Sequence, residues 1–110
     1  MIEDTLVALV DRFNRHCDQN PGVQEELQGK DRVIELCLQE GQNYHFELKG
    51  GRLTPPRLGN GSRPDVRILT DSATFEQLVR KEIGPMKALV SRRLQIEASL
   101  EDKLLLRRLL

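Results

Sequence analysis

The sequence predicts an α+β fold: a two-layer sandwich in which helices cover one face of a five-stranded, mostly antiparallel sheet. Three observations lead to this fold class. The chain has 110 residues, which suits a single hydrophobic core. Apolar residues recur at helical spacing near both of its ends, and the segments between alternate apolar with polar side chains. A sheet with one apolar face needs one covering layer, which gives the two layers. Because the chain is long enough for one core only, we expect a single domain over residues 1–110.

The first helix is predicted over residues 2–18, where apolar side chains return every three or four positions. The stripe consists of Ile2, Leu6, Leu9, Val10, Phe13 and Cys17. Asn20-Pro21-Gly22 ends the helix, and residues 23–28 are expected to add a short helical turn. We interpret Cys17, the last member of the stripe, as a small core residue rather than a reactive thiol.

Five strands are predicted, each with one apolar and one polar face. They are residues 32–39, 43–49, 52–54, 65–69 and 94–98. The turn Glu40-Gly41-Gln42 joins the first two strands into a hairpin, and Gly50-Gly51 leads into the third. Because proline cannot donate a ladder hydrogen bond, Pro55-Pro56 makes this third strand short or places it at an edge.

Two further helices are predicted between the fourth and fifth strands. Asp71 is a suitable N-cap for the first, whose inward face is Phe75, Leu78 and Val79. Gly84-Pro85 ends this helix and begins the next one.

A final helix opens at Ser99 and Asp102, which resemble a capping box. It carries leucines on most of its sides, so it needs more than one apolar neighbour. Three interpretations fit this helix: a crowded core helix, a cover over a bound lipid, or a surface that docks a second subunit.

The composition argues against several function classes. Seventeen basic residues balance seventeen acidic ones, so the basic excess typical of nucleic-acid binding is missing. Cys17 and Cys37 have no metal-site spacing, and neither His16 nor His45 is placed to serve a pocket under the helices. We therefore expect no enzyme activity, no metal site and no cofactor. The start of the chain lacks a signal peptide, and no apolar run is long enough to span a membrane, which predicts a cytoplasmic protein.

The polar face of the sheet is expected to be solvated. Glu35, Glu47 and Glu97 fall on this face by their phase in the strands, where they form a charge mosaic with basic residues. The basic members are Lys49, Arg67 and Arg93.

From Ile34 onward, the order of short motifs resembles the sterol carrier protein 2 family of lipid-binding domains, over residues 31–110. The motifs are Glu40-Gly41, Tyr44-x-Phe46, Gly51-Arg52, Asp65-Val66-Arg67-Ile68, Asp71-Ser72-x-x-Phe75-x-x-Leu78, Gly84-Pro85-Met86-Lys87-Ala88 and Leu94-x-Ile96, followed by a leucine-rich closing helix. The chain departs from the family where glycines are common: Lys81, Arg92 and Ala98 occupy those positions.

The resemblance implies an apolar tunnel between sheet and helices that binds and carries a fatty acyl chain, a sterol or another lipid without covalent chemistry. It implies transient contact with membranes as well. The residues it places in the tunnel are Phe75, Leu78, Met86, Val90, Leu94, Ile96, Leu105 and Leu109. The alternative is a structural or interaction protein of the same fold, whose core is filled and which forms a homodimer or serves an enzyme partner.

Overall fold

The computed structural model describes the backbone of residues 2–59 and 63–109, and the side-chain environment of residues 2–59 and 63–104. The described elements follow one another as five helices and six strands. Their bounds are α1 (Ile2–Gln19), α2 (Pro21–Leu27), β1 (Arg32–Leu38), β2 (Asn43–Lys49), β3 (Arg52–Leu53), β4 (Arg57–Leu58), β5 (Val66–Thr70), α3 (Ser72–Val79), α4 (Pro85–Val90), β6 (Leu94–Glu97) and α5 (Leu100–Leu109).

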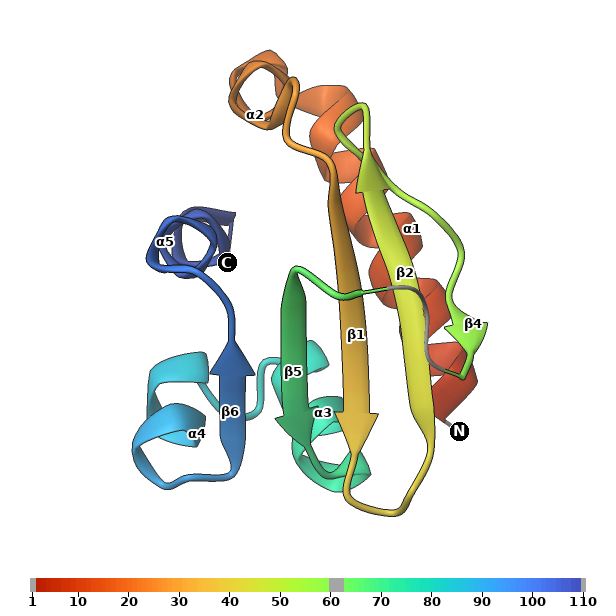
Figure 1. The fold of residues 1–110 in the computed structure, drawn as a ribbon, viewed down its shortest axis with the longest axis vertical. Coiled ribbons are helices and arrows are strands. Elements are labelled where there is room, and N and C mark those ends of the chain that lie inside the picture. The colour runs from red at the N-terminus through yellow and green to blue at the C-terminus, as the bar shows by residue number, and fades with distance from the viewer. Residues whose placement is uncertain (1, 60–62, 110) are drawn as a thin grey trace.

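The strands form one sheet in the order β3-β2-β1-β5-β6, and β4 pairs with β2 beside β3 (Figure 1). Strands β1 and β5 run parallel, whereas the other pairs are antiparallel. The α+β fold and all five predicted strands are confirmed. The short strand β4 was missed because two residues after a Pro-Pro pair are too few to show alternation.

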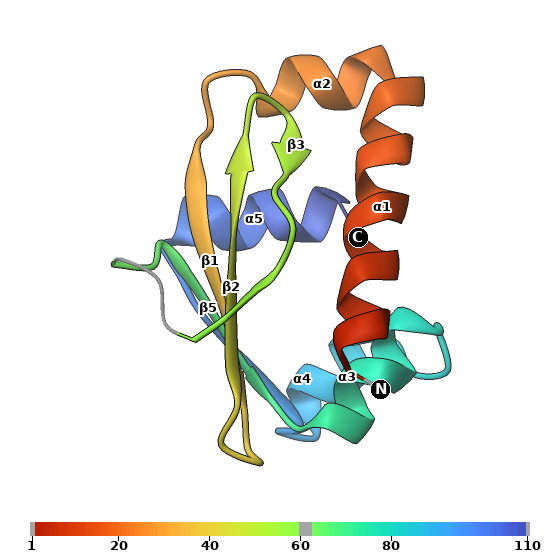
Figure 2. The same ribbon diagram turned by 90° about the vertical axis from the view of Figure 1, so that its right-hand side faces the viewer.

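Helices α1 to α4 lie on one side of the sheet, and α5 runs from the end of β6 toward α1 (Figure 2). The opposite face has no helix over it among the described elements. In Figure 1, α5 lies beyond the end of β6 and beside the start of β1. The covering layer is therefore made of elements from both ends of the chain.

Local sequence signals explain where the helices start. The Asp71 side chain accepts a 2.7 Å hydrogen bond from the Thr74 backbone N–H, as expected of an N-cap. At α5, the Ser99 hydroxyl accepts from the Asp102 backbone N–H at 3.1 Å. The reciprocal half of the expected capping box is replaced, because the Asp102 carboxylate accepts from Arg32 Nε instead, at 2.8 Å.

Candidate apolar ligand site

The inner face of the sheet follows from the strand register. Leu36 of β1 is paired with Tyr44 of β2 on one side and with Ile68 of β5 on the other, and Ile68 is paired with Ile96 of β6. Register partners point to the same side of a sheet, so these four side chains form one row across the inner face. The helices cover this row.

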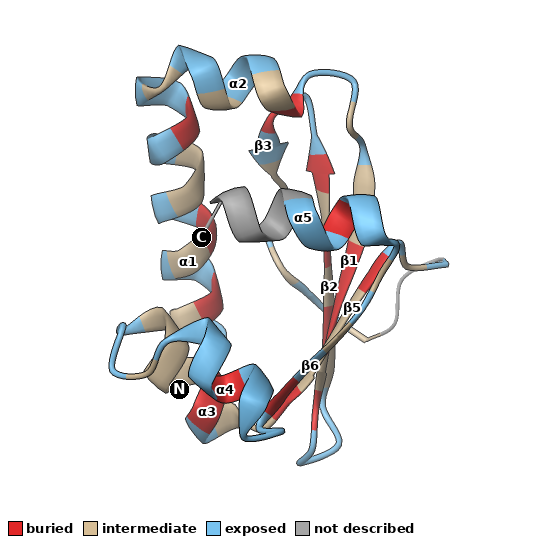
Figure 3. Cartoon of the chain, turned by 90° about the vertical axis from the view of Figure 1, so that its left-hand side faces the viewer, coloured by how far each residue is buried: buried red, intermediate tan, exposed pale blue. Residues whose placement is uncertain are grey.

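The β1–β2 part of this face is tightly packed. We call it the packed half: the inner residues of β1 and β2 with the residues of α1 and α2 that cover them. Its members Leu6, Cys17, Leu27 and Leu36 have no exposed surface. Figure 3 shows buried positions along α1, β1 and β2. A ligand has no room here without displacing side chains.

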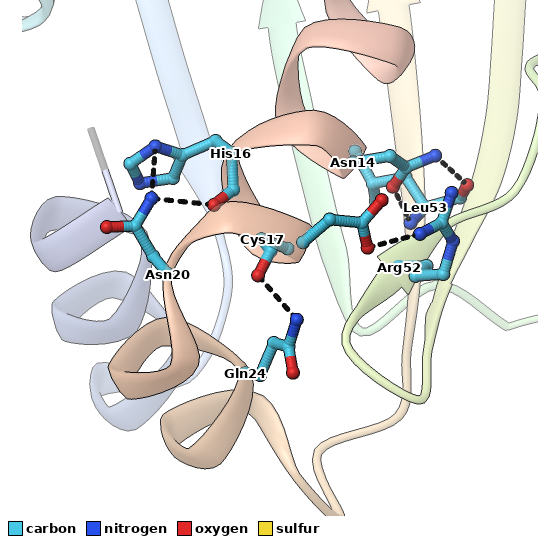
Figure 4. Close-up of polar contacts among 8 residues, drawn as sticks. Asn14, His16, Cys17, Asn20, Gln24, Arg52 and Leu53 are labelled. Carbon is cyan, nitrogen blue, oxygen red and sulfur yellow. Dashed lines mark hydrogen bonds and ion pairs between the residues drawn. The ribbon is translucent and has the colours of Figure 1, made fainter.

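Hydrogen bonds fix α1 over the packed half. Asn14 of α1 donates to the Leu53 carbonyl at 3.0 Å and accepts from the Leu53 N–H at 2.7 Å, which joins the helix to β3 (Figure 4). At the other end of α1, the Tyr44 hydroxyl donates to the Glu3 carboxylate at 2.8 Å. This hydrogen bond lowers the pKa of Glu3, while burial is the main cause that raises the pKa of Tyr44.

The β5–β6 part is covered incompletely. We call it the partly covered half: the inner residues of β5 and β6 with α3, α4 and α5. Ile68 and Ile96 at its centre are only half-buried, although buried residues surround them. These neighbours are Leu36, Val66, Thr70 and Leu94. Solvent therefore reaches an apolar pair that packs against the core at the β6 edge of the sheet.

The predicted site residues divide between several environments. Phe75 of α3 and Leu94 of β6 are buried, with 7% and 6% of their surface exposed. Leu78 and Ile96 are half-buried, so all four belong to the partly covered half. Leu105 and Leu109 lie outside the residues whose side chains the structure describes. Ligand contact by any of these residues stays a prediction.

Met86 and Val90 do not face the interior, and their expected orientation is wrong. They are 60% and 80% exposed, whereas Ala88 between them is fully buried. Each helical residue advances by about 100°, so Ala88 lies about 200° from both and points to the opposite side of α4. The sequence analysis overlooked Ala88, because it seeks bulky apolar residues and α4 buries a small one against the sheet.

Helix α5 continues the chain beyond the end of β6 and lies beside the start of β1 (Figure 1). Among the described residues, its ion pair with the sheet joins Asp102 Oδ1 to Arg32 Nε at 2.8 Å. This hydrogen bond is the main cause that raises the pKa of Arg32. Leu100 and Leu104 of the same helix are 75% and 51% exposed. Apolar surface on α5 is therefore available for a contact that the isolated chain does not make.

A polar cleft of about 250 Å³ lies elsewhere, between α1 and β3. Its lining consists of Asp11, Asn14, Arg15 and Arg52. Two of these side chains already serve the structure, because Asn14 bonds Leu53 and Arg52 pairs with Asp18 (Figure 4). The composition of this cleft does not suit an apolar ligand.

The outer face carries a buried charge that the sequence analysis placed in solvent. Glu35 is 6% exposed and accepts a hydrogen bond from the Cys37 thiol, with Oε1 and Sγ 3.0 Å apart. Arg67 Nη1 donates to Glu97 at 2.8 Å, and Arg67 Nε lies 3.5 Å from Glu35. The expectation of a solvated residue is wrong for Glu35, because it lies on β1 at the centre of the sheet, between strands β2 and β5. Arg93, expected in the same mosaic, instead bonds Thr74 and Gln77 of α3.

The two thiols are not activated overall, although Arg67 Nη2 lies 3.6 Å from Cys37 Sγ. Burial is the main cause that raises the pKa of both Cys17 and Cys37, so both thiols are protonated at neutral pH. His16 Nδ1 contacts the Asn20 amide, and His45 Nδ1 lies 2.8 Å from the Gly59 carbonyl. Across the described residues, no group of three or more His, Cys, Asp or Glu side chains is placed to hold a metal ion.

Comparison with known proteins assigns the family. The model of the SCP-2 sterol transfer family matches residues 13–110. The chain belongs to this family. The predicted resemblance to sterol carrier protein 2 is thereby confirmed, and the function class that membership implies is lipid or sterol binding or transfer. No curated protein matches this chain.

Solved structures share the fold at low sequence identity. The ubiquinone synthesis protein UbiJ-SCP2 aligns with a TM-score of 0.70 and 10% identity over 98% of this chain and 91% of its own. The sterol carrier protein domain 2 of Helicoverpa armigera gives 0.65 and 14%, over 96% and 84%. The sec-alkylsulfatase Pisa1 from Pseudomonas sp. aligns with a TM-score of 0.67 and 16% identity over 94% of this chain but only 15% of its own. This chain therefore spans a small part of that enzyme's length.

None of the described helices is both long enough and apolar enough to cross a bilayer.

Proposed function

We propose that this protein binds and carries an apolar ligand, a fatty acyl chain, sterol or other lipid, on the partly covered half of the sheet. The observation that carries the proposal is the half-buried pair Ile68 and Ile96, which buried neighbours surround. Both side chains pack against the core and still expose apolar surface, which a ligand could cover. Membership in a sterol transfer family supports the same ligand class.

The proposed ligand contacts are Phe75, Leu78, Leu94 and Ile96, with Leu105 and Leu109 of α5 as further members. Apolar burial supplies the affinity, at about 25 cal/mol per Å². A ligand and site that together bury about 500 Å² of apolar surface gain about 12 kcal/mol, and an entropy loss of about 4 kcal/mol leaves the roughly 8 kcal/mol of micromolar binding. Micromolar affinity with few polar contacts is the expected result.

The proposal involves no covalent chemistry. Its support is the protonated state of both thiols and the structural engagement of both histidines. A carrier needs only a surface that excludes water. The two free cysteines suit a reducing compartment, which supports a cytoplasmic setting.

Ligand uptake tests the proposal. Native mass spectrometry of the purified chain should show co-purified lipid, or a fluorescent fatty acid should bind with micromolar affinity. Ile96→Trp should fill the gap and weaken probe binding by more than about tenfold without lowering the melting temperature. Val7→Trp is the matched control, because Val7 is 49% exposed on α1. If neither variant changes probe binding, the ligand does not lie at Ile96; if wild type takes up no apolar probe, the carrier function is wrong.

A second candidate is an interaction module of the same fold, with a filled core, that forms a homodimer or serves an enzyme. Two observations favour it: Leu100 and Leu104 expose apolar surface on α5, and a domain-sized part of a sec-alkylsulfatase shares this fold. A stable dimer in light scattering that Leu104→Ser dissociates, together with no probe uptake, would support this function instead.

A further inference from the structure

Helix α4 presents apolar side chains to solvent. Met86 and Val90 lie one turn apart and are 60% and 80% exposed, and Leu89 beside them is 36% exposed. Together they form an arc of about 100° around the helix, opposite the buried Ala88. Such grouping differs from the scattered apolar residues of an ordinary surface.

Basic residues surround this arc. Residues 80–93 contain five Lys or Arg and one Glu, a net charge of +4, in a chain whose total charge is zero. Within the described structure, none of these five cations has an ion pair. The five are Arg80, Lys81, Lys87, Arg92 and Arg93. Positive charge is thus concentrated around α4.

Two of these cations occupy strained backbone positions. Lys81, before α4, has φ 62°, and Arg92, after it, has φ 63°. These are left-handed conformations in which glycine costs less than any residue with a Cβ atom. Glycine at these two positions would relieve the strain, so replacing them removes charge without a structural cost.

We propose that the α4 surface, residues 80–93, docks on a bilayer that contains anionic lipids. The cations attract the lipid headgroups, and Met86, Leu89 and Val90 enter the boundary between headgroups and acyl chains. The apolar arc favours a membrane over a nucleic acid, because these side chains have nothing to pack against along a phosphate backbone. Helix α4 contacts β6 and buries Ala88, so docking through the exposed side of α4 brings the partly covered half near the bilayer.

Vesicle sedimentation with the full chain tests the proposal. The chain should bind vesicles of phosphatidylcholine with about one-third phosphatidylserine, and not vesicles of phosphatidylcholine alone. Raising the ionic strength should release it, because salt screens exposed charges. Failure to bind the anionic vesicles, or equal binding to both kinds, would overturn the proposal.

The double variant Lys81→Gly/Arg92→Gly separates function from structure. Binding to anionic vesicles should fall by about 25-fold, on the order of fivefold per cation, while the melting temperature stays the same or rises. The charge-matched control is Arg15→Gln/Arg57→Gln, which removes two exposed cations outside the α4 surface. An equal loss in the control would show that net charge alone matters and would overturn the docking site.

The apolar arc has its own test. Met86→Gln/Val90→Gln should weaken vesicle binding by at least about tenfold, whereas Val7→Gln/Leu58→Gln, which alters residues 49% and 70% exposed elsewhere, should not. Duplex DNA is the competing partner. If it binds the wild type as tightly as vesicles do, and Met86→Gln/Val90→Gln weakens neither interaction, the partner is a nucleic acid and the membrane proposal is wrong. Uptake of a fluorescent fatty acid should be unchanged in all four variants, so membrane docking and ligand binding can fail separately.

Discussion

Leu36 and Ile68 are paired across two central strands, yet their surroundings differ. Leu36 has no exposed surface, whereas solvent reaches Ile68. Over Leu36 lies α1, which Asn14 and Glu3 fasten to β3 and β2. The helices on the side of Ile68 are α3 and α4, and α5 lies beyond the end of β6 (Figure 1), where Asp102 pairs with Arg32 of β1. The boundary between the two halves of the inner face runs between these two residues.

This difference separates two tasks within one sheet. Close packing in one half supplies the stability that a domain of 110 residues needs. The other half can then leave apolar surface available, because the fold does not depend on its complete closure. If this interpretation is right, equivalent changes in the two halves should have different costs.

The largest difference is expected between Leu36→Ala and Ile68→Ala. Leu36→Ala opens a cavity in the packed half and should lower the free energy of unfolding by about 3–4 kcal/mol. Ile68→Ala removes a side chain that is already partly exposed and should cost about 1–2 kcal/mol, while weakening probe binding. Urea denaturation measures both values. Equal losses would mean that the two halves are packed alike.

The tie of α5 should give the next largest effect. Asp102→Ala removes the partner of Arg32 and the side chain of a carboxylate with only 9% exposure, so we expect a loss of about 1–3 kcal/mol. Because the proposed ligand contacts include Leu105 and Leu109 of α5, the affinity for a fluorescent fatty acid should change as well. Glu101→Ala is the control, since this neighbouring acid is exposed. An unchanged affinity in the Asp102 variant would show that α5 does not cover the ligand.

The sequence predicted where the helices and strands lie better than it predicted which of their residues are buried. Alternation located every strand except β4, because this pattern extends over several residues. The inward residue of α4 could not be found this way, since a six-residue helix with apolar side chains all around has no defined face. Burial of Glu35 was also missed, because phase assigns a residue to a face of the sheet and says nothing of how deeply its neighbours cover it.

Acid should weaken the partly covered half through Asp71. The Thr74 backbone N–H is the main cause that holds the pKa of Asp71 below its ordinary value. Its contribution is therefore complete above about pH 4 and is lost as the pH falls through the lower folded value. Asp71→Ala should cost about 1 kcal/mol at pH 7 and less at more acidic pH. Unfolding curves from pH 7 to about pH 3, compared with the control Asp4→Ala on α1, measure this; a cost independent of pH would contradict the charged cap.

The smallest change in stability is expected for a substitution at Glu97, which lies on the edge strand β6. Glu35 lies on the central strand β1, so the two residues compare a central and an edge position on the outer face of the sheet. Both carboxylates lie beside Arg67, but the Glu97 side chain is 56% exposed and that of Glu35 only 8%. Water replaces the lost contact in Glu97→Gln, so the melting temperature should not change measurably. Glu35→Gln leaves the Cys37 thiol and Arg67 with a weaker acceptor in a buried setting and should cost about 1 kcal/mol. Thermal unfolding measures the melting temperatures of both variants. A larger drop for Glu97→Gln than for Glu35→Gln would mean that exposure does not determine the stability loss on the outer face. Burial would then be a poor guide to the stability losses expected in the packed half as well.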